Sequence, residues 1–302
     1  MMDRSAAAEG SDLAYAQADR EGRDFKRTAN VLGVLVDSLD LERALARIGD
    51  LLRSGQKGYV CAISVHGVLE ARRNPEVAQA FAEAAMVAPD GTPMVWVGRL
   101  EGRRDIGQVT GPELMEEILS RPEFADCSHF FYGGKEGVAD GLAATWRRKI
   151  PGARIAGTFT PPFRDLTADE ERELVSLLRE SKPDVIWVGI STPRQELFMH
   201  RMIGRLDRGL MFGVGAAFDF HTGRIRNCAP WIKRMGFHWL HRLVQDPRRL
   251  WRRNLSNAAF LWHIALQLAG IRKYERPLGG VDHGAGSQRA SAASSSSAAE
   301  SA

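Results

Sequence analysis

The chain has 302 residues, of which 44% are hydrophobic and 26% charged, enough apolar material for one large α/β domain with an appendage or for two smaller domains. Cys61, Cys127 and Cys228 are far apart and lack CxxC or metal-ligand spacing, which excludes a disulfide framework and suits a reducing cytoplasm. The polar N-terminus has no signal-peptide pattern, and no apolar run reaches the roughly 18 to 20 residues that a membrane span needs. We therefore expect a cytoplasmic protein that contacts a membrane only from its surface.

Residues 29–229 are expected to form the core domain, because short apolar runs alternate there with amphipathic segments. The expected strands are Val31–Val36, Tyr59–Val65, Phe130–Tyr132, Arg154–Phe159, Val185–Ile190 and Leu210–Val214. The expected helices are Leu41–Leu52, Glu76–Ala85, Met94–Leu100, Pro112–Leu119, Val138–Lys149, Ala168–Glu180 and Arg194–Leu206. This alternation predicts a Rossmann-like α/β domain with a mostly parallel sheet and helices on both faces. Its ligands should lie beyond the carboxyl ends of the strands.

The segments outside this core differ from it in composition. Residues 1–28 and 276–302 are expected to be disordered tails, the second one rich in Gly, Ser and Ala. Residues 230–275 are expected to form a helical appendage rich in Arg and Trp. Between Arg224 and Arg253, nine Lys and Arg residues accompany one acid, Asp246, so this block favours an anionic partner such as lipid head groups, a diphosphate or nucleic acid.

Asp90 follows an apolar run and lies between Pro89 and Pro93, which stiffen the turn. A carboxylate held in such a loop serves either as a helix cap or as a general base that deprotonates an acceptor hydroxyl. His66 is an alternative base, because an imidazole titrates near neutral pH.

Gly133, Gly134 and Gly137 lead from an expected strand into an expected helix. Glycines allow backbone N–H groups to approach a phosphate, although a plain strand-to-helix turn explains them equally well. The spacing does not match the G-x-G-x-x-G pattern of dinucleotide-binding proteins.

Two further loops carry polar residues directly after a strand. One expected helix begins with Arg194, Gln195 and Glu196. These side chains could bind the hydroxyl groups of a sugar or ribose; alternatively, Glu196 is only a carboxylate that caps the helix. Asp219 follows a strand that ends in small residues. Its carboxylate either accepts hydrogen bonds from a nucleotide base or ribose, or only occupies a turn.

Five segments occur in this order: APDGTPMVW, TGPELM, FFYGGKEGVA, GISTPRQE and GVGAAFDFHTGRIRNCAPWIKRMGFHWLHRLVQDPRRLWRR. Together they resemble the WecG/TagA/CpsF glycosyltransferase family over roughly residues 30–255. The resemblance implies an inverting transferase that needs neither metal nor cofactor. It also implies a UDP-sugar donor and a polyprenyl-diphosphate-linked acceptor at the inner face of the cell membrane. Members of the family make teichoic acid linkage units, enterobacterial common antigen, and exopolysaccharide or capsule repeat units.

By position, the resemblance assigns Asp90 as the catalytic base and Gln195 as an active-site glutamine, and it places Asp219 near the uracil. The residues expected to bind the donor are Ser64, Gly133, Gly134, Gly137, Arg194, Glu196 and Asp219. The residues expected to face the acceptor diphosphate are Arg242, Arg249 and Arg252. We expect the glycine loop, together with Arg194 or Gln195, to stabilise the departing UDP.

The sequence departs from the teichoic-acid branch of this family near the expected sugar pocket. Ala62 and Ser64 replace Thr and Asn, and Gln108 replaces an Arg. The donor sugar is therefore open between N-acetylmannosamine, glucose and a uronic acid.

The tryptophans of the appendage interleave with its arginines, and indoles favour the boundary between water and lipid. They predict peripheral docking on the membrane, or they pack the appendage on the core. A nicotinamide-dependent oxidoreductase would share the α/β pattern but lacks its fingerprint here. A nucleic-acid-binding protein would explain the basic helices but not the APDG and TPRQE loops, so no nucleic acid partner is expected. A homo-oligomer is left open.

Overall fold

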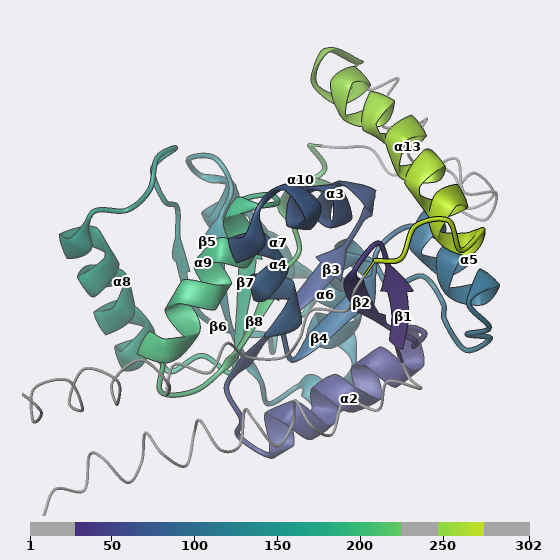
Figure 1. Cartoon of the computed structure of the whole chain (residues 1–302). Helices are drawn as coiled ribbons and strands as arrows, with labels where there is room; N and C mark the ends of the chain where they lie inside the picture. The colour runs from purple at the N-terminus through teal and green to yellow at the C-terminus, as the bar shows by residue number, and fades with distance from the viewer. Residues whose placement is uncertain (1–27, 225–246, 275–302) are drawn as a thin grey trace, which may run out of the picture.

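The computed structural model describes residues 28–224 and 247–274, and its centre is a six-stranded sheet (Figure 1). The strands of this sheet are β3 (Gly58–Ile63), β4 (Met86–Pro89), β5 (Ser128–Gly133), β6 (Arg154–Phe159), β7 (Val185–Gly189) and β8 (Leu210–Gly213). Their order is β4-β3-β8-β7-β5-β6, and every neighbouring pair is parallel. The carboxyl ends of all six strands therefore meet at one edge, as the sequence predicts for this fold class.

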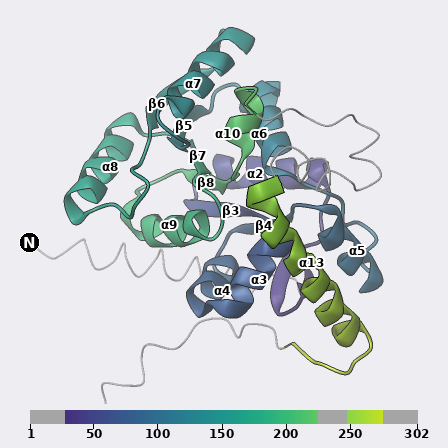
Figure 2. The ribbon, with the colours of Figure 1, turned by 90° about the horizontal axis from the view of Figure 1, so that it is seen from above.

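Helices cover both faces of the sheet (Figure 2). One face carries α2 (Leu41–Arg53), α6 (Gly111–Ser120), α7 (Val138–Lys149) and α10 (Ala217–His221). The other carries α3 (Val65–Arg73), α4 (Pro75–Ala82), α8 (Ala168–Ser181) and α9 (Arg194–Met202). Two helices lie at the β4 end, α5 (Thr92–Leu100) and α13 (Pro247–Leu268).

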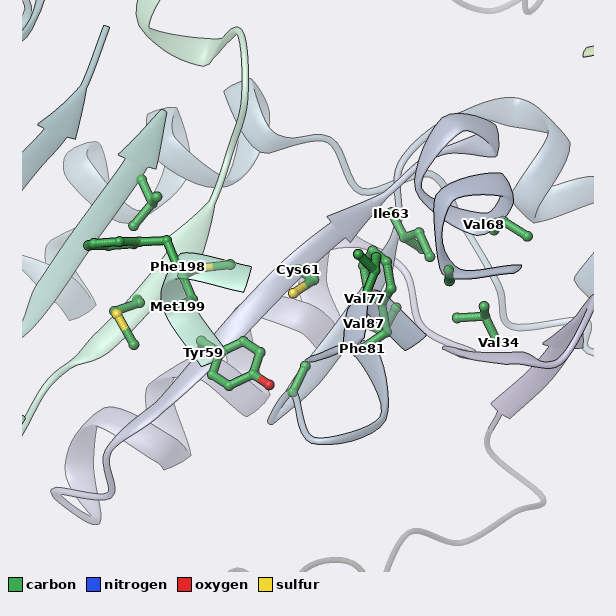
Figure 3. Packing of buried hydrophobic residues seen from close by; sticks show 14 of the residues in the cluster. Val34, Tyr59, Cys61, Ile63, Val68, Val77, Phe81, Val87, Phe198 and Met199 are labelled. Atoms are coloured by element: carbon green, nitrogen blue, oxygen red, sulfur yellow. The ribbon is translucent and has the colours of Figure 1, made fainter. Parts of the chain in front are cut away.

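Alternate residues of each strand point into two separate apolar cores. On β3, Tyr59, Cys61 and Ile63 pack with Val77 and Phe81 of α4 (Figure 3), whereas Val60 packs against the opposite helices. Because both faces are covered, the strands β3, β7 and β8 are continuous apolar runs, whereas the edge strand β6 is partly exposed and carries Arg154 and Thr158.

The predicted strand Val31–Val36 is wrong as a single element. It is a hairpin of two antiparallel strands, β1 (Thr28–Val31) and β2 (Val34–Asp37), which do not join the main sheet. Leu32 and Gly33 form the turn with φ of 53° and 96°. The turn was missed because Leu32, an apolar residue, occupies a left-handed conformation that the sequence does not signal.

Within the described part of the appendage, residues 247–274, the predicted helix is present as α13 up to Leu268, whereas residues 269–274 are not helical; α13 is anchored on the core. Phe260 and Ile264 are buried in the core beside α3. The Gln267 side chain donates to the Asn30 carbonyl (2.6 Å) and to Glu101 (3.0 Å), which ends α5. The hairpin, α5 and the C-terminal part of α13 therefore form one packed unit next to β4.

Candidate functional site

Asp90 lies directly after β4, at the edge where all strands of the sheet end. Its backbone N–H donates to the Ile63 carbonyl of β3 (2.9 Å), and the Val109 N–H donates to the Pro89 carbonyl (3.0 Å). These bonds hold the loop on both sides, while Asp90 itself stays partly exposed. A general base requires a carboxylate at a fixed place that substrate can reach, and the position of Asp90 is compatible with that role.

Ser64 directly follows β3, the strand next to β4. It is the N-cap residue of α3, but its side chain makes no capping hydrogen bond. The hydroxyl therefore lies on the same edge as Asp90 and is not used to close the helix.

The glycine loop after β5 has two parts. A Cβ atom at Gly133 would lie 2.6 Å from the Gly189 carbonyl oxygen, so only glycine allows β5 to approach β7 this closely. The Gly134 N–H donates to the same carbonyl (3.0 Å), so this part of the loop is explained by packing. Gly137 is different, because it is the exposed N-cap residue of α7 with φ of 74° and no atom near its Cβ position. It leaves the N-terminus of a 12-residue helix exposed and without a side-chain cap, a place that favours anions, although the Asp140 carboxylate lies in the same first turn.

Gln195 and Glu196 are buried at the start of α9, with 2% and 0% of their surface exposed. The Gln195 Nε2 donates to Glu196 Oε1 (2.9 Å), and Gln195 Oε1 accepts from the Gly215 N–H (3.0 Å). Thr192 Oγ1 donates to the same Glu196 oxygen (3.0 Å). This network joins the loop after β7 to the loop after β8.

The second carboxyl oxygen of Glu196, Oε2, is buried and has no hydrogen-bond partner within the described part of the chain. Burial raises the pKa of Glu196 above its ordinary value, and the hydrogen bonds from Gln195 and Thr192 oppose this only in part. The hydrogen bond from Gln195 Nε2 to Glu196 Oε1 fixes the orientation of the Gln195 amide.

Arg194 and Asp219 lie on the same edge and are partly exposed. Arg194 is the first residue of α9, and its Nη2 donates to the Arg164 carbonyl in the loop after β6 (3.0 Å). Asp219 lies in α10, which follows the Gly215 loop. The fold thus brings Asp90, Ser64, Gly137, Arg194 and Asp219 to one edge of the sheet, each after a different strand.

The expected acceptor residues are less well described. Arg242 lies outside the described residues, and Arg249 and Arg252 fall in the first turns of α13. The sequence analysis did not single out Phe163, whose side chain is 100% exposed in the loop after β6. The signal available was its position, directly after Thr160-Pro161-Pro162 at a strand end.

The fold is that of a doubly wound α/β protein, in which ligands bind in the crevice beyond the strand ends. The chain belongs to the glycosyl transferase WecG/TagA/CpsF family, whose model matches residues 29–274. It is 28% identical over 207 residues to an N-acetylglucosaminyldiphosphoundecaprenol N-acetyl-beta-D-mannosaminyltransferase of Bacillus spizizenii strain W23, covering 68% of this chain and 76% of that protein. An enzyme of the same name from Bacillus subtilis strain 168 is 26% identical over 193 residues, covering 61% of this chain and 73% of that protein. Within residues 28–224 and 247–274, no helix has the length and hydropathy of a membrane span.

Proposed function

We propose that the protein transfers a sugar from a UDP-sugar to a polyprenyl-diphosphate-linked acceptor, with inversion at the anomeric carbon and without a metal ion. Membership of the family supports glycosyl transfer, and the names of both Bacillus relatives support an acceptor with a diphosphate and a polyprenyl chain. The observation that carries the proposal is the position of Asp90. It is a partly exposed carboxylate on a loop fixed by two backbone hydrogen bonds, at the ligand-binding edge of the sheet.

The proposed reaction begins when an acceptor hydroxyl attacks the anomeric carbon from the side opposite to UDP. Asp90 takes the hydroxyl proton, the new C–O bond forms, and the bond between the sugar and the UDP oxygen breaks. Negative charge then develops on the diphosphate. The open N-terminus of α7 at Gly137 and the Arg194 guanidinium are the groups that we assign to this charge.

The identity of the donor sugar follows less directly from these observations than the identity of the acceptor. Both relatives transfer N-acetylmannosamine by name. The departures from that branch of the family are Ala62 near the end of β3, Ser64 directly after β3, and Gln108 on the connection between α5 and α6. N-acetylmannosamine, glucose and a uronic acid are therefore the donors to compare.

A donor panel tests this function. The purified protein is incubated with each of the three UDP-sugars and a synthetic polyprenyl-diphosphate N-acetylglucosamine, and the products are identified by mass spectrometry. We expect one product mass, the same yield in EDTA, and an inverted anomeric configuration by NMR. Absence of any transfer with every donor, or transfer that needs an added divalent ion, would contradict the proposal.

We also propose that α5 and α13 rest on an anionic lipid surface, which would bring a lipid-linked acceptor to the site. The two helices lie near each other (Figure 2), and large exposed apolar side chains occur on both and just after α13: Trp96, Leu100, Leu261, Trp262, Leu268 and Ile271. From Asn254 to Ile271 the chain has no Lys, Arg, Asp or Glu. Basic residues flank this stretch, with Arg252 and Arg253 before it and Arg272 and Lys273 after it. An apolar face with basic ends fits anionic head groups, to which each basic residue near the surface adds about 1 kcal/mol.

Sedimentation with vesicles separates this docking from the chemistry. Replacing Trp96 and Trp262 with Ala should reduce sedimentation with phosphatidylglycerol vesicles at least tenfold, while transfer to a short-chain, water-soluble acceptor stays within twofold. The matched control is Leu177→Ala, an exposed apolar residue on α8. Unchanged sedimentation of the double variant would refute the docking surface and leave the proposed reaction intact.

A further inference from the structure

Tyr274 lies a few residues after α13 and is fixed at both its backbone and its hydroxyl. The chain turns at Gly270, which has φ of 69°, and Tyr274 comes to lie beside the helix. Its carbonyl accepts a hydrogen bond from Asn30 Nδ2 of β1 (3.1 Å). Its hydroxyl is hydrogen-bonded to His263 Nδ1 of α13 (3.0 Å). The Tyr274 ring is therefore held at a defined place between α13 and the hairpin.

Two arginines from distant parts of the chain lie against this ring. Arg72 is in the last turn of α3, and its guanidinium carbon is 5.0 Å from the Tyr274 ring centroid. Arg272 follows α13, and its guanidinium carbon is 5.5 Å from the same centroid. Both distances are within the range of a cation–π contact. Because α3 and α13 pack side by side (Figure 2), the ring gathers two guanidinium groups that would otherwise repel each other.

These two positive charges have no acid beside them to neutralise them. Within the described part of the chain, neither Arg72 nor Arg272 forms an ion pair with a carboxylate. The residue next to Arg72 differs, because Arg73 pairs with Glu70 (3.3 Å). Burial lowers the pKa of His263 below its ordinary value, and the charges of Arg72 and Arg272 lower it further. A place where positive charge is held without a counter-ion favours an anion.

The surroundings of the two arginines indicate the kind of anion. Ile271, the residue before Arg272, is 75% exposed and belongs to the apolar surface that we propose rests on lipid. Arg72 lies about 12 Å along α3 from Ser64, which marks the edge of the sheet where transfer is proposed. A phosphate bound by this pair would therefore belong to a lipid of the membrane surface and not to the reacting acceptor.

We propose that Arg72 and Arg272, held by Tyr274, bind the phosphate group of an anionic phospholipid. This inference rests on the proposed docking of α5 and α13, because it takes the lipid to be present at that surface. A guanidinium group presents parallel N–H donors that match two oxygens of a phosphate. The pair would thus add recognition of a phosphate to a surface whose other contacts with lipid are apolar.

Sedimentation of two matched variants with phosphatidylglycerol vesicles tests the site. Arg72→Gln and Arg73→Gln remove the same charge from adjacent positions of α3, but Arg72 lies against Tyr274 whereas Arg73 pairs with Glu70. We expect Arg72→Gln to weaken binding to the vesicles about five- to tenfold, while Arg73→Gln stays within twofold of the wild type. Transfer to the short-chain, water-soluble acceptor should stay within twofold in both variants.

The titration of His263 gives a second measurement, which needs no change at the two arginines. The imidazole is followed by NMR, and its signal is identified by its loss in His263→Gln. Dihexanoylphosphatidylglycerol, below the concentration at which it forms micelles, should offset the charges of Arg72 and Arg272 and so raise the pKa of His263. Dihexanoylphosphatidylcholine, whose phosphate carries its own choline cation, should leave that pKa unchanged.

Each other result has a definite meaning. Equal losses of vesicle binding by Arg72→Gln and Arg73→Gln overturn the site and leave only a general attraction between charges. An unchanged pKa of His263 with the phosphatidylglycerol probe also overturns it. Loss of transfer to the water-soluble acceptor by Arg72→Gln overturns it as well, and would make Arg72 a contact of the acceptor. Failure of the wild-type protein to sediment with the vesicles would instead refute the proposed docking surface.

Discussion

Replacing Gln195 with Ala tests whether the buried network between the loops after β7 and β8 holds the site in place. The substitution removes the hydrogen bonds to Glu196 (2.9 Å) and from Gly215 (3.0 Å). Each such bond contributes about 1 kcal/mol, and the partly buried Gly215 N–H left without a partner costs about a further 1 to 2 kcal/mol. We expect the free energy of unfolding to fall by about 3 to 4 kcal/mol, which for a domain of this size corresponds to a melting temperature about 10 °C lower.

Thermal unfolding and UDP titration of the same protein samples separate two roles of Gln195. If it positions the Gly215 loop, the melting temperature and the UDP affinity of Gln195→Ala fall together. The matched control is Gln79→Ala, an exposed glutamine on α4 whose side chain donates to Glu83 (3.0 Å), which should change stability by less than about 0.5 kcal/mol. A Gln195→Ala protein that melts like the wild type but has lost turnover would refute the positioning role and support direct contact with substrate.

Two further predictions concern pH. Burial raises the pKa of Glu196 above the ordinary value of 4.5. The contribution of the Glu196 side chain to the free energy of unfolding is therefore full below pH 4.5 and is lost as the pH rises toward the raised pKa. Urea unfolding between pH 4 and 9 should show this loss in the wild type and not in Glu196→Gln. Burial lowers the pKa of His129 to about 4, against an opposing effect of Asp184, so stability should fall by about 3 kcal/mol as the pH drops from 6.5 to 4. His129→Gln should lack that fall, and an identical acid profile for this variant would exclude His129 as its cause.

Much of the core was predictable because its elements have clear ends. The predicted strand Arg154–Phe159 and helix Val138–Lys149 match β6 and α7 residue for residue, and Thr167 and Glu170 form the predicted capping box. The prediction missed α3, because Val65 continues the apolar run of β3 and Ser64 makes no side-chain cap to mark the boundary. The order of the strands depends on contacts between distant segments, so the central position of β7 and β8 was not readable from local patterns.

The sequence predicted where the loops of the candidate site lie, but not which of their side chains are buried. Every loop singled out in the core lies at the carboxyl edge of the sheet, because a parallel sheet requires it. Polar residues at a helix start are usually exposed, yet Gln195 and Glu196 are buried and bond each other. Their burial follows from the close packing of α9 against β8, where a Cβ atom at Gly213 would lie 3.1 Å from Gln195 Nε2.

The assignment of Asp90 as the base is tested most directly by Asp90→Asn, which keeps the shape of the side chain but cannot take up the proton. Turnover with a UDP-sugar and the lipid-linked acceptor should fall about 10²- to 10⁴-fold, the usual contribution of a general base. UDP binding, measured by calorimetry on the same protein, should stay within twofold of the wild type. A variant that turns over at close to the wild-type rate would contradict the account and place the base elsewhere.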